Sequence, residues 1–319
     1  MTRRLALLCL LSILCPASTL AAEPEFRAGD PSWSPDGGRV AFDGGYGSGQ
    51  ASDIYVVNAD GTNLRNLTAD DPNPNVLPSW GRHVGHVAYE TVFSTSQVVD
   101  VQYSLMPPDG STRLNLARST AIGPIYWSSG DRYIAFDGRF EARTLALAAP
   151  RVRLIALGRS GPWAPKLLRL ALGVEVGSNV HLVIASPSGT QRRRLTFGRE
   201  GVRPIAWSPD GGSILFEASR GAVSSFNLYV VRVRDRRLLR LAAAARDGDF
   251  SPSGEWVVYS LAKGGVLTVS VDGTRRRRLT SDGVAPRWSP DGRWIAYQAG
   301  ARIDVMRPDG SGRRTLVGS

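Results

Sequence analysis

Residues 31–42, PSWSPDGGRVAF, are repeated almost unchanged at residues 286–297 as PRWSPDGRWIAY. Further copies, intact or eroded, lie between them. Each copy has one aromatic anchor, followed by a turn and a short apolar run. The anchors are Trp33, Trp80, Trp127, Trp163, Trp207, Phe250 and Trp288. Their mean spacing of about 42 residues is the length of one supersecondary unit in a repeat protein. The chain is therefore expected to fold as a ring or stack of similar modules.

Each module predicts two hairpins. In SPDG at residues 34–37, Pro35 fixes the first turn dihedral, Asp36 can accept a hydrogen bond from its own backbone, and Gly37 tolerates a positive φ. A second pair of short runs rich in Val, Ile, Tyr and Leu follows, joined by a DGT or DGS turn, as in IYVVNADGTNLRNLT at 54–68. Four antiparallel strands of this length make a propeller blade.

The predicted fold is thus an all-β β-propeller. Seven openings and seven closing hairpins predict seven four-stranded blades. The fourth opening, around Trp163, is eroded, and six blades remain the alternative. We interpret the anchor rings as packing residues that fill the wedge between blades, because a large ring there can bury about 150 to 250 Å².

The first 22 residues have the three parts of a secretory signal peptide: Arg3 and Arg4, an apolar run, and a small-residue end at Ala21 and Ala22. We therefore expect domains at 1–22 (signal peptide) and 23–319 (one propeller), with export to the periplasm or the medium. Retention of the segment as an anchor is the alternative. Both cysteines lie within it, so disulfides and thiol chemistry are not expected in the mature chain.

The order PxWSPDGxxIAF followed by IYVxxxDGTxxRxLT resembles the TolB-like propeller repeat, a relative of the WD40 repeat, and the resemblance covers residues 31–317. It implies a rigid scaffold in the cell envelope that binds other molecules. It also implies a departure, because the family's founding member carries an α/β domain ahead of a six-bladed propeller, whereas here residues 23–30 alone separate the predicted cleavage site from the first repeat.

No catalytic motif is found. The nucleophile elbow G-x-S-x-G does not occur, and GYGSG at 45–49 has its serine one position away. His83 and His86 align with turn positions of other repeats, so we interpret them as drift rather than as metal ligands, and His181 opens a strand. We therefore expect no enzyme activity, no metal and no cofactor.

The net charge of +11 comes mostly from arginine, since only Lys166 and Lys263 are lysines. Such a skew can follow from base composition, so nucleic-acid binding is not expected. Arginine runs at 192–194, 232–237 and 275–278 fall beside predicted outer strands. Charged outer strands discourage edge-to-edge pairing. The alternative is a basic belt that contacts anionic envelope polymer or lipid.

Propellers commonly bind partners at the ends of the central channel, so we place the candidate site in the loops between repeats. The partner-binding residues predicted for one channel mouth are Asp70, Asp71, Asn73, Arg199, Glu200, Arg203, Arg246, Asp249, Asp282 and Arg287.

The function expected from the sequence is that of an exported, monomeric, non-catalytic scaffold that binds an envelope or extracellular protein or carbohydrate. Two alternatives stay open. One is a propeller enzyme that acts on envelope or extracellular carbohydrate, and the other is a regulatory propeller related to those of serine peptidases. Paired carboxylates near the axis, about 5 to 9 Å apart, would favour the first of them.

Overall fold

The structure is a computed structural model that describes residues 26–46, 52–83, 85–94, 99–149, 151–196, 201–219 and 226–318. The predicted signal peptide, residues 1–22, lies outside the described residues. Where the chain is described, its regular elements are all β-strands. The prediction of an all-β fold is confirmed.

Five sheets have four strands each, and every one is built from strands consecutive in the chain. The first holds β1 (Phe26–Trp33), β2 (Arg39–Tyr46), β3 (Asp53–Asn58) and β4 (Arg65–Asn66). The second holds β5 (Asn75–Trp80), β6 (Val87–Ser94), β7 (Val99–Met106) and β8 (Leu114–Ser119). The other three hold β16 (Gly201–Trp207), β17 (Ser213–Ser219), β18 (Phe226–Arg232) and β19 (Leu238–Ala242); β20 (Ala245–Phe250), β21 (Trp256–Leu261), β22 (Val266–Ser270) and β23 (Arg276–Arg278); and β24 (Val284–Trp288), β25 (Ile295–Ala299), β26 (Arg302–Met306) and β27 (Arg314–Val317).

The remaining strands form one seven-stranded sheet in the order β15 to β9. They are β9 (Tyr126–Trp127), β10 (Tyr133–Asp137), β11 (Glu141–Ala146), β12 (Val152–Arg159), β13 (Leu170–Val176), β14 (Asn179–Ala185) and β15 (Arg192–Arg194).

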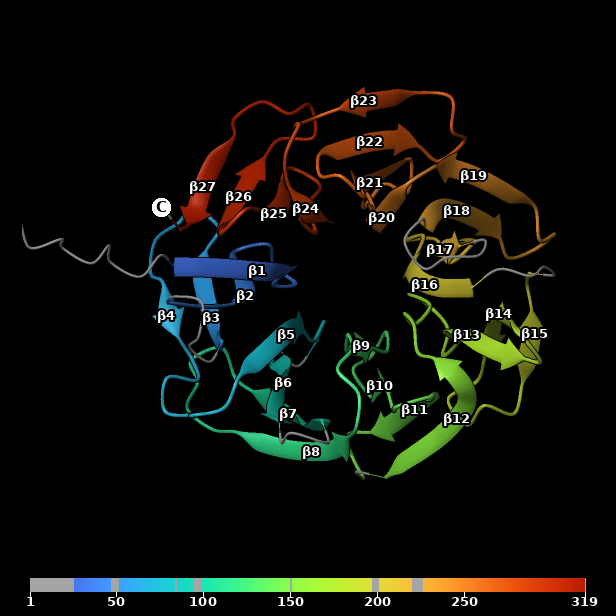
Figure 1. Cartoon of the computed structure of the whole chain (residues 1–319), viewed down its shortest axis with the longest axis horizontal. Coiled ribbons are helices and arrows are strands. Elements are labelled where there is room, and N and C mark those ends of the chain that lie inside the picture. Colours follow the sequence, from blue (N-terminus) through green and yellow to red (C-terminus); the bar gives the residue numbers. More distant parts are fainter. Residues whose placement is uncertain are drawn as a thin grey trace, which may run out of the picture.

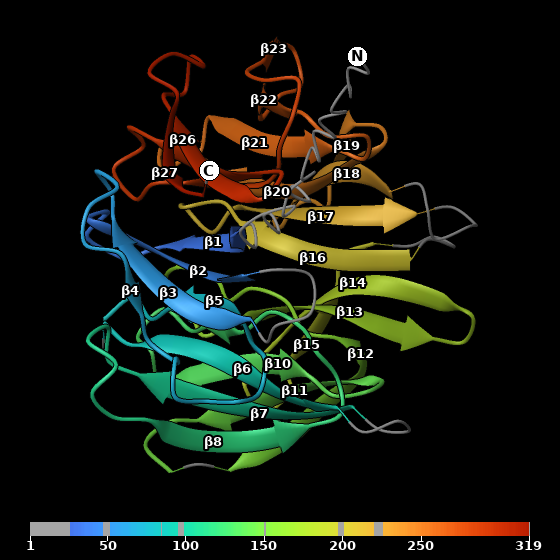
Figure 2. The same ribbon diagram turned by 60° about the vertical axis from the view of Figure 1, so that its left-hand side comes forward.

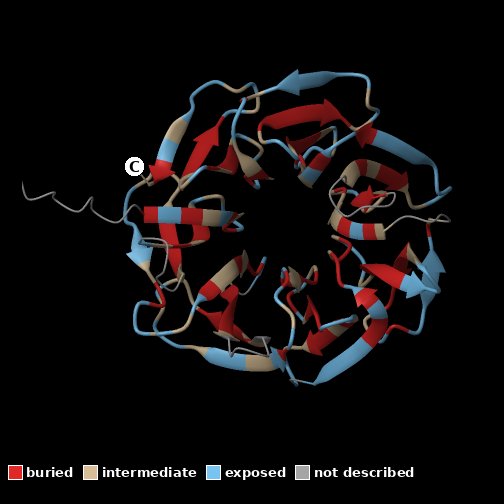
Figure 3. Cartoon of the chain, viewed as in Figure 1, coloured by how far each residue is buried: buried red, intermediate tan, exposed pale blue. Residues whose placement is uncertain are grey.

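The sheets stand in a ring (Figure 1), with β1, β5, β9, β16, β20 and β24 on its inner side and β4, β8, β19, β23 and β27 on its outer side. This arrangement is a β-propeller. Clusters of buried apolar residues lie between successive sheets, and the middle strands are the most buried while the outer strands are exposed (Figure 3). Packing between sheets therefore supplies the core.

The predicted number of blades is wrong. Five blades are four-stranded, not seven or six, because the segments expected to form the third and fourth blades share one sheet. The cause is β12, whose last residues leave β11 and pair with β13 through Gly158 with Val174 and Arg159 with Gly173. The eroded fourth opening contributes no inner strand of its own, since Trp163 forms only an isolated bridge to Leu170.

The ring closes between the first and last sheets without exchanging a strand (Figure 2). Ala28 N–H donates to the carbonyl of Ala301 at 2.9 Å. Around this bond the apolar side chains of β1–β3 pack against those of β25–β27, with Phe42 and Ile303 fully buried. Side-chain packing, rather than a shared sheet, therefore holds the two ends of the described chain together.

Four anchor tryptophans join successive units through one recurrent hydrogen bond, whereas the buried Nε1–H groups of Trp80 and Trp288 have no partner in the described structure. The indole Nε1–H donates to the backbone carbonyl of the residue just before the previous anchor in the ring. The bonds run from Trp33 to Arg287, Trp127 to Ser79, Trp163 to Tyr126 and Trp207 to Pro162, at 2.9 to 3.2 Å. Since Trp33, Trp127 and Trp163 are buried and Trp207 is partly buried, their interpretation as packing residues is confirmed.

The predicted turns are present. Gly37 has a φ of 70° and its N–H donates to the carbonyl of Ser34 at 2.9 Å. Asp36 Oδ1 accepts hydrogen bonds from Ser34 Oγ at 2.6 Å and from Gly38 N–H at 2.9 Å. The aspartate of the repeated SPDG motif thus serves the turn itself, which explains its recurrence without a ligand.

Several arginines of the outer strands bind neighbouring units. Arg65 donates to the carbonyl of Asp109 at 2.9 Å, Arg276 to that of Leu241 at 2.5 Å, and Arg314 to that of Ala59 at 2.5 Å. These guanidinium groups stabilise the ring as well as covering strand edges. Contact with an anionic polymer or lipid stays a prediction.

In the described part of the chain, no helix is long and apolar enough to cross a membrane.

Candidate functional site at the centre of the ring

Four carboxylates occupy the same position in four repeats, directly after the apolar run of the second strand. They are Asp43, Glu90, Asp137 and Glu217. Each accepts a hydrogen bond from a backbone N–H that lies further along the chain, after the outer strands of the same unit. In the order given above, the donors are Leu77 at 3.0 Å, Gly123 at 3.2 Å, Ser160 at 2.6 Å and Asp247 at 2.8 Å. The second strand of one unit therefore holds the inner end of the next.

Two of these bonds reach a strained backbone position. Leu77 and Asp247 have φ values of 54° each, in the left-handed region that L-residues seldom adopt, and both lie in a β-bulge of their strand. Such a conformation costs on the order of 1 kcal/mol or more. A charge-assisted hydrogen bond from the preceding unit offsets that cost.

Burial perturbs the acidity of all four groups. Desolvation raises the pKa of Asp43 to about 6, helped by the nearby Asp30 carboxylate. It raises the pKa of Glu90 to about 8, against the opposing effect of the hydrogen bond from Gly123. The pKa values of Asp137 and Glu217 are also raised by desolvation, and Arg159 and Arg203 respectively oppose the rise.

Glu90 has no exposed surface, and in the described structure its Oε2 has no hydrogen-bond partner. Its proton is bound more tightly in the folded chain than in the unfolded chain, where the pKa is near 4.5. The contribution of Glu90 to the free energy of unfolding should therefore be fully present below about pH 4.5 and be lost as the pH rises through about 8. Glu90→Gln keeps an acceptor for Gly123 but cannot ionise, so it should lose this fall and exceed the wild type by a few kcal/mol at pH 8.

Urea unfolding of the two proteins between pH 5 and pH 9 measures the difference. Glu175→Gln, on the exposed end of β13, keeps Glu90 and should keep the fall. An identical pH dependence in wild type and Glu90→Gln would contradict the assignment.

A second group of charges, here called the axial cluster, comprises Asp30, Arg203, Asp247, Asp249 and Arg287. These residues come from β1, β16, β20 and β24, which lie on the inner side of the ring (Figure 1). Arg203 Nη2 lies 2.8 Å from Glu217 Oε2 and 3.6 Å from Asp247 Oδ1. Asp249 Oδ2 accepts the N–H of Trp288 at 3.0 Å. Strands far apart in sequence thus bring both signs of charge together.

The electrostatics show that the axial cluster is one unit. Desolvation raises the pKa of Asp30, Arg287 lowers it, and Asp247 raises it further. Desolvation also raises the pKa of Asp249, while Arg287 and Arg82 lower it. For Arg203 desolvation opposes the charge, but Glu217 and other groups raise its pKa above the ordinary value.

The axial cluster remains accessible. The Asp30 side chain is exposed, Asp247 and Asp249 are partly exposed, and the Arg203 side chain keeps 49% of its surface. Such a cluster can bind a polar or charged group that offers partners of both signs. No group of three or more His, Cys, Asp or Glu side chains that could hold a metal ion occurs within the described ranges.

The structure separates the predicted site residues into several groups. Arg203, Asp249 and Arg287 meet in the axial cluster. Asp282 instead pairs with Arg313 at 3.0 Å and also accepts a hydrogen bond from Thr280. Arg246 is exposed on β20 without a bond from its side chain in the described structure.

Asp70, Asp71 and Asn73 belong to the segment between β4 and β5. Asp70 forms an ion pair with Arg113, and Asp71 accepts the N–H of Asn73 at 3.0 Å. Arg199 and Glu200 lie outside the described residues. Partner binding by the predicted set stays a prediction.

Sequence reasoning missed Asp30, Asp247 and the four carboxylates after the second strand. The signal for the carboxylates was present, since VAFD, VAYE, IAFD and ILFE place an acid at one repeat position. Asp30 and Asp247 each stand three residues before an anchor, Trp33 and Phe250 respectively.

No family model matches the chain. Among curated proteins, it is similar to the Tol-Pal system protein TolB of Anaeromyxobacter dehalogenans, with 32% identity over 156 residues that cover 47% of this chain and 32% of that protein. It is also similar to the uncharacterized peptidase YuxL of Bacillus subtilis, with 31% identity over 144 residues, 43% of this chain and 21% of that protein. The chain spans a third or less of the length of these relatives.

Solved structures share the fold. The putative TolB of Agrobacterium tumefaciens matches with a TM-score of 0.54 at 20% identity, over 65% of this chain and 84% of that one. An oligogalacturonate lyase in complex with manganese matches with a TM-score of 0.65 at 12% identity, over 86% of both chains. The propeller domain of the Trilobed protease from Pyrococcus furiosus, described as having an open velcro topology, matches with a TM-score of 0.66 at 10% identity, over 93% and 97%.

Proposed function

We propose that this TolB-like β-propeller is an exported, non-catalytic scaffold of the cell envelope, which binds a protein partner or a ligand at the centre of its ring. The axial cluster carries the proposal, because accessible groups of both signs converge there from strands of different sheets. The similarity to a Tol-Pal system protein supports an envelope role.

The burial of the second-strand carboxylates supports a scaffold as well. Asp43, Glu90, Asp137 and Glu217 each accept a backbone N–H of the following unit. Their raised pKa values follow from this structural position, so chemistry on a substrate is not needed to account for them.

Crosslinking in the native envelope followed by mass spectrometry tests the proposal. A partner should crosslink to the wild type, and Arg287→Glu should lower its yield by about tenfold, because the substitution reverses the charge beside Asp30 and Asp249. Arg277→Glu, the same change on the outer strand β23, is the matched control and should retain the partner. Equal losses in both variants, or a partner crosslinked only to outer strands, would overturn the central site.

A propeller enzyme that acts on carbohydrate is the second candidate, and one observation favours it. Asp43 has a pKa of about 6 beside the Asp30 carboxylate, and Asp30 is exposed. Two neighbouring carboxyl groups can serve as acid and base where one is protonated and the other ionised. Release of reducing sugar from an envelope polysaccharide or an oligogalacturonate by the wild type, lost in Asp43→Asn, would favour the enzyme over the scaffold.

A further inference from the structure

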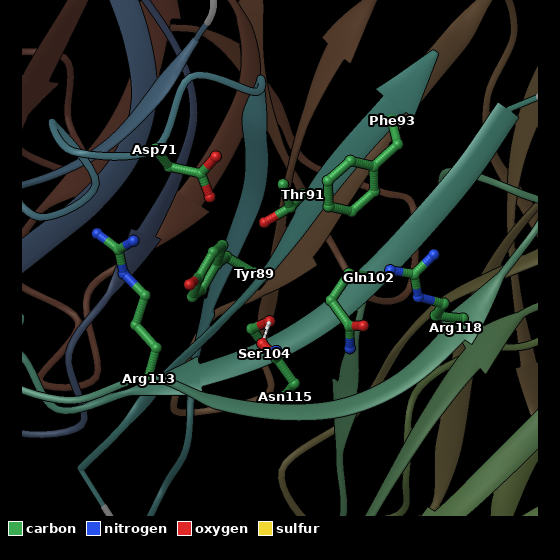
Figure 4. Close-up of a pocket in the computed structure, with 9 residues that line it drawn as sticks. All are labelled: Asp71, Tyr89, Thr91, Phe93, Gln102, Ser104, Arg113, Asn115 and Arg118. Atoms are coloured by element: carbon green, nitrogen blue, oxygen red, sulfur yellow. Dashed lines mark hydrogen bonds between the residues drawn. The ribbon is translucent and has the colours of Figure 1, made fainter. Parts of the chain in front are cut away.

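A polar pocket of about 260 Å³ opens on the face of the β5–β8 sheet, away from the axial cluster (Figure 4). Tyr89 and Phe93 come from β6, Gln102 and Ser104 from β7, and Asn115 from β8. Asp71, from the segment that leads into this sheet, lies at the rim opposite these strands. No residue of the axial cluster lines the pocket.

The pocket lies where a serine stands at a ladder position that two other sheets fill with an aromatic ring. Tyr89 lies directly opposite Ser104 in the ladder of β6 and β7. At the same place the β1–β4 sheet has Phe42 opposite Tyr55, with the rings stacked at 5.5 Å. The β16–β19 sheet likewise stacks Phe216 on Tyr229 at 5.5 Å. Ser104 thus leaves empty the space that a tyrosine fills in those two sheets.

Strand length widens the opening. β6 and β7 pair over eight residues, so that Thr91 and Phe93 continue the face beyond Tyr89, opposite Gln102 and Asp100. By contrast, β25 and β26 pair over five residues. Figure 4 shows the Tyr89 and Phe93 rings on one side of the pocket, with Gln102, Ser104 and Asn115 on the neighbouring strands.

The cations of the pocket are already neutralised. Arg118 pairs with Asp100 at 2.5 Å, and its guanidinium lies 5.3 Å from the centre of the Phe93 ring. Arg113 pairs with Asp70 at the other end. An anionic ligand would have to compete with these carboxylates, so the pocket favours an uncharged one.

The Asp71 carboxylate at the rim accepts two hydrogen bonds from Asn73 at 3.0 Å. The uncharged polar groups of the lining are amides and hydroxyls. Gln102 Nε2 donates to the carbonyls of Tyr103 and Ala117 at 2.8 and 2.9 Å, and none of the described groups donates to its carbonyl oxygen. Asn115 Oδ1 accepts from Ser104 Oγ at 3.0 Å, which turns its amide nitrogen toward other acceptors. Ligand pockets are more often apolar, with few polar groups. A lining of amides, hydroxyls and two aromatic rings suits a polyhydroxylated ring with an apolar face.

We propose that this pocket binds one sugar unit of an uncharged glycan, with hydrogen bonds to Gln102 and Asn115 and a ring contact to Phe93. The volume accommodates about one pyranose ring. The site is independent of the axial cluster, so it can be present whether or not the proposed central partner exists.

Titration of the full chain with free monosaccharides, followed by NMR of the aromatic side chains, tests the proposal. Glucose and N-acetylglucosamine should bind with dissociation constants on the order of millimolar, as expected for a small, open site. The ring signals of Phe93 should shift, and galacturonate should bind more weakly. Absence of saturable binding by both neutral sugars, or tighter binding of galacturonate, would overturn the assignment.

Ser104→Tyr creates the aromatic pair that the β1–β4 and β16–β19 sheets have, and it fills the pocket. It should therefore weaken sugar binding by at least about tenfold. Asn115→Leu, at an exposed position of β8, should have a similar effect and serves if the first variant does not fold. Leu114→Ala, next to it but outside the pocket lining, is the matched control and should bind as the wild type does. Unchanged affinity in the folded Ser104 or Asn115 variant would contradict the proposal.

Discussion

Replacing Trp33 with alanine should lower the free energy of unfolding by about 3 to 5 kcal/mol. The ring is 8% exposed and packs where the first and last sheets meet, so its removal leaves a cavity at the closure of the ring. The loss of its Nε1–H also deprives the Arg287 carbonyl of its donor. Trp33→Phe keeps most of the apolar contact and should cost about 1 kcal/mol through the hydrogen bond alone.

Urea unfolding monitored by circular dichroism measures both variants. Trp294→Ala is a suitable comparison, because Trp294 is only partly buried and lies under Arg307 and Arg314. It should cost clearly less than Trp33→Ala. A Trp33→Ala protein within 1 kcal/mol of the wild type would show that closure does not depend on the anchor ring.

Gly158→Ala should destabilise the protein by about 3 kcal/mol or more. Gly158 has a φ of 126°, and a Cβ atom there would lie 1.9 Å from the carbonyl oxygen of Gly173. The strand cannot then pass from β11 to β13, and the pairing that makes the seven-stranded sheet continuous should be lost. Gly177→Ala, at a φ of 64° with no atom within 4 Å, should cost only about 1 to 2 kcal/mol.

Thermal unfolding and limited proteolysis within residues 140–180 check this prediction. The Gly158 variant should be cut sooner than the Gly177 variant at equal temperature. Equal stability of the two would mean that the β12–β13 pairing adds nothing to the sheet.

The sequence predicted the fold class because the repeat carries its own local instructions. Pro35, Asp36 and Gly37 specify a turn by backbone preference and short-range hydrogen bonds, and the structure contains that turn. The anchor rings were identified by spacing alone, since an aromatic residue once per module has few roles other than packing.

The number of blades could not be predicted in the same way. Whether Gly158 pairs across to Val174 depends on the relative position of two neighbouring hairpins, which no local motif specifies. The erosion around Trp163 was visible, but its consequence was a merged sheet rather than a missing or an additional blade.

Only part of the candidate site could be predicted, because some of its contacts also depend on how neighbouring sheets are placed. Arg203, Asp249 and Arg287 were found because they flank anchors in loop-like stretches. Asp30 was missed because it precedes the first repeat and lies within a strand, β1, next to a β-bulge and with a φ of 44°. The bond from Asp43 to Leu77 joins residues of different sheets, so it becomes visible only when the ring is assembled.

Because every described sheet is built from consecutive strands and the ring closes by side-chain packing, no strand depends on a distant segment to complete its sheet. Outside the seven-stranded sheet, duplication or deletion of a whole repeat would leave no strand without its partners. It would change only the angle at which the remaining sheets meet. The contacts between neighbouring sheets would adjust. These contacts include the hydrogen bonds of the anchor tryptophans, the outer-strand arginines and the second-strand carboxylates, which recur around the ring and can form again with a new neighbour. An architecture of this kind allows the circumference, and with it the width of the central binding surface, to change by whole repeats.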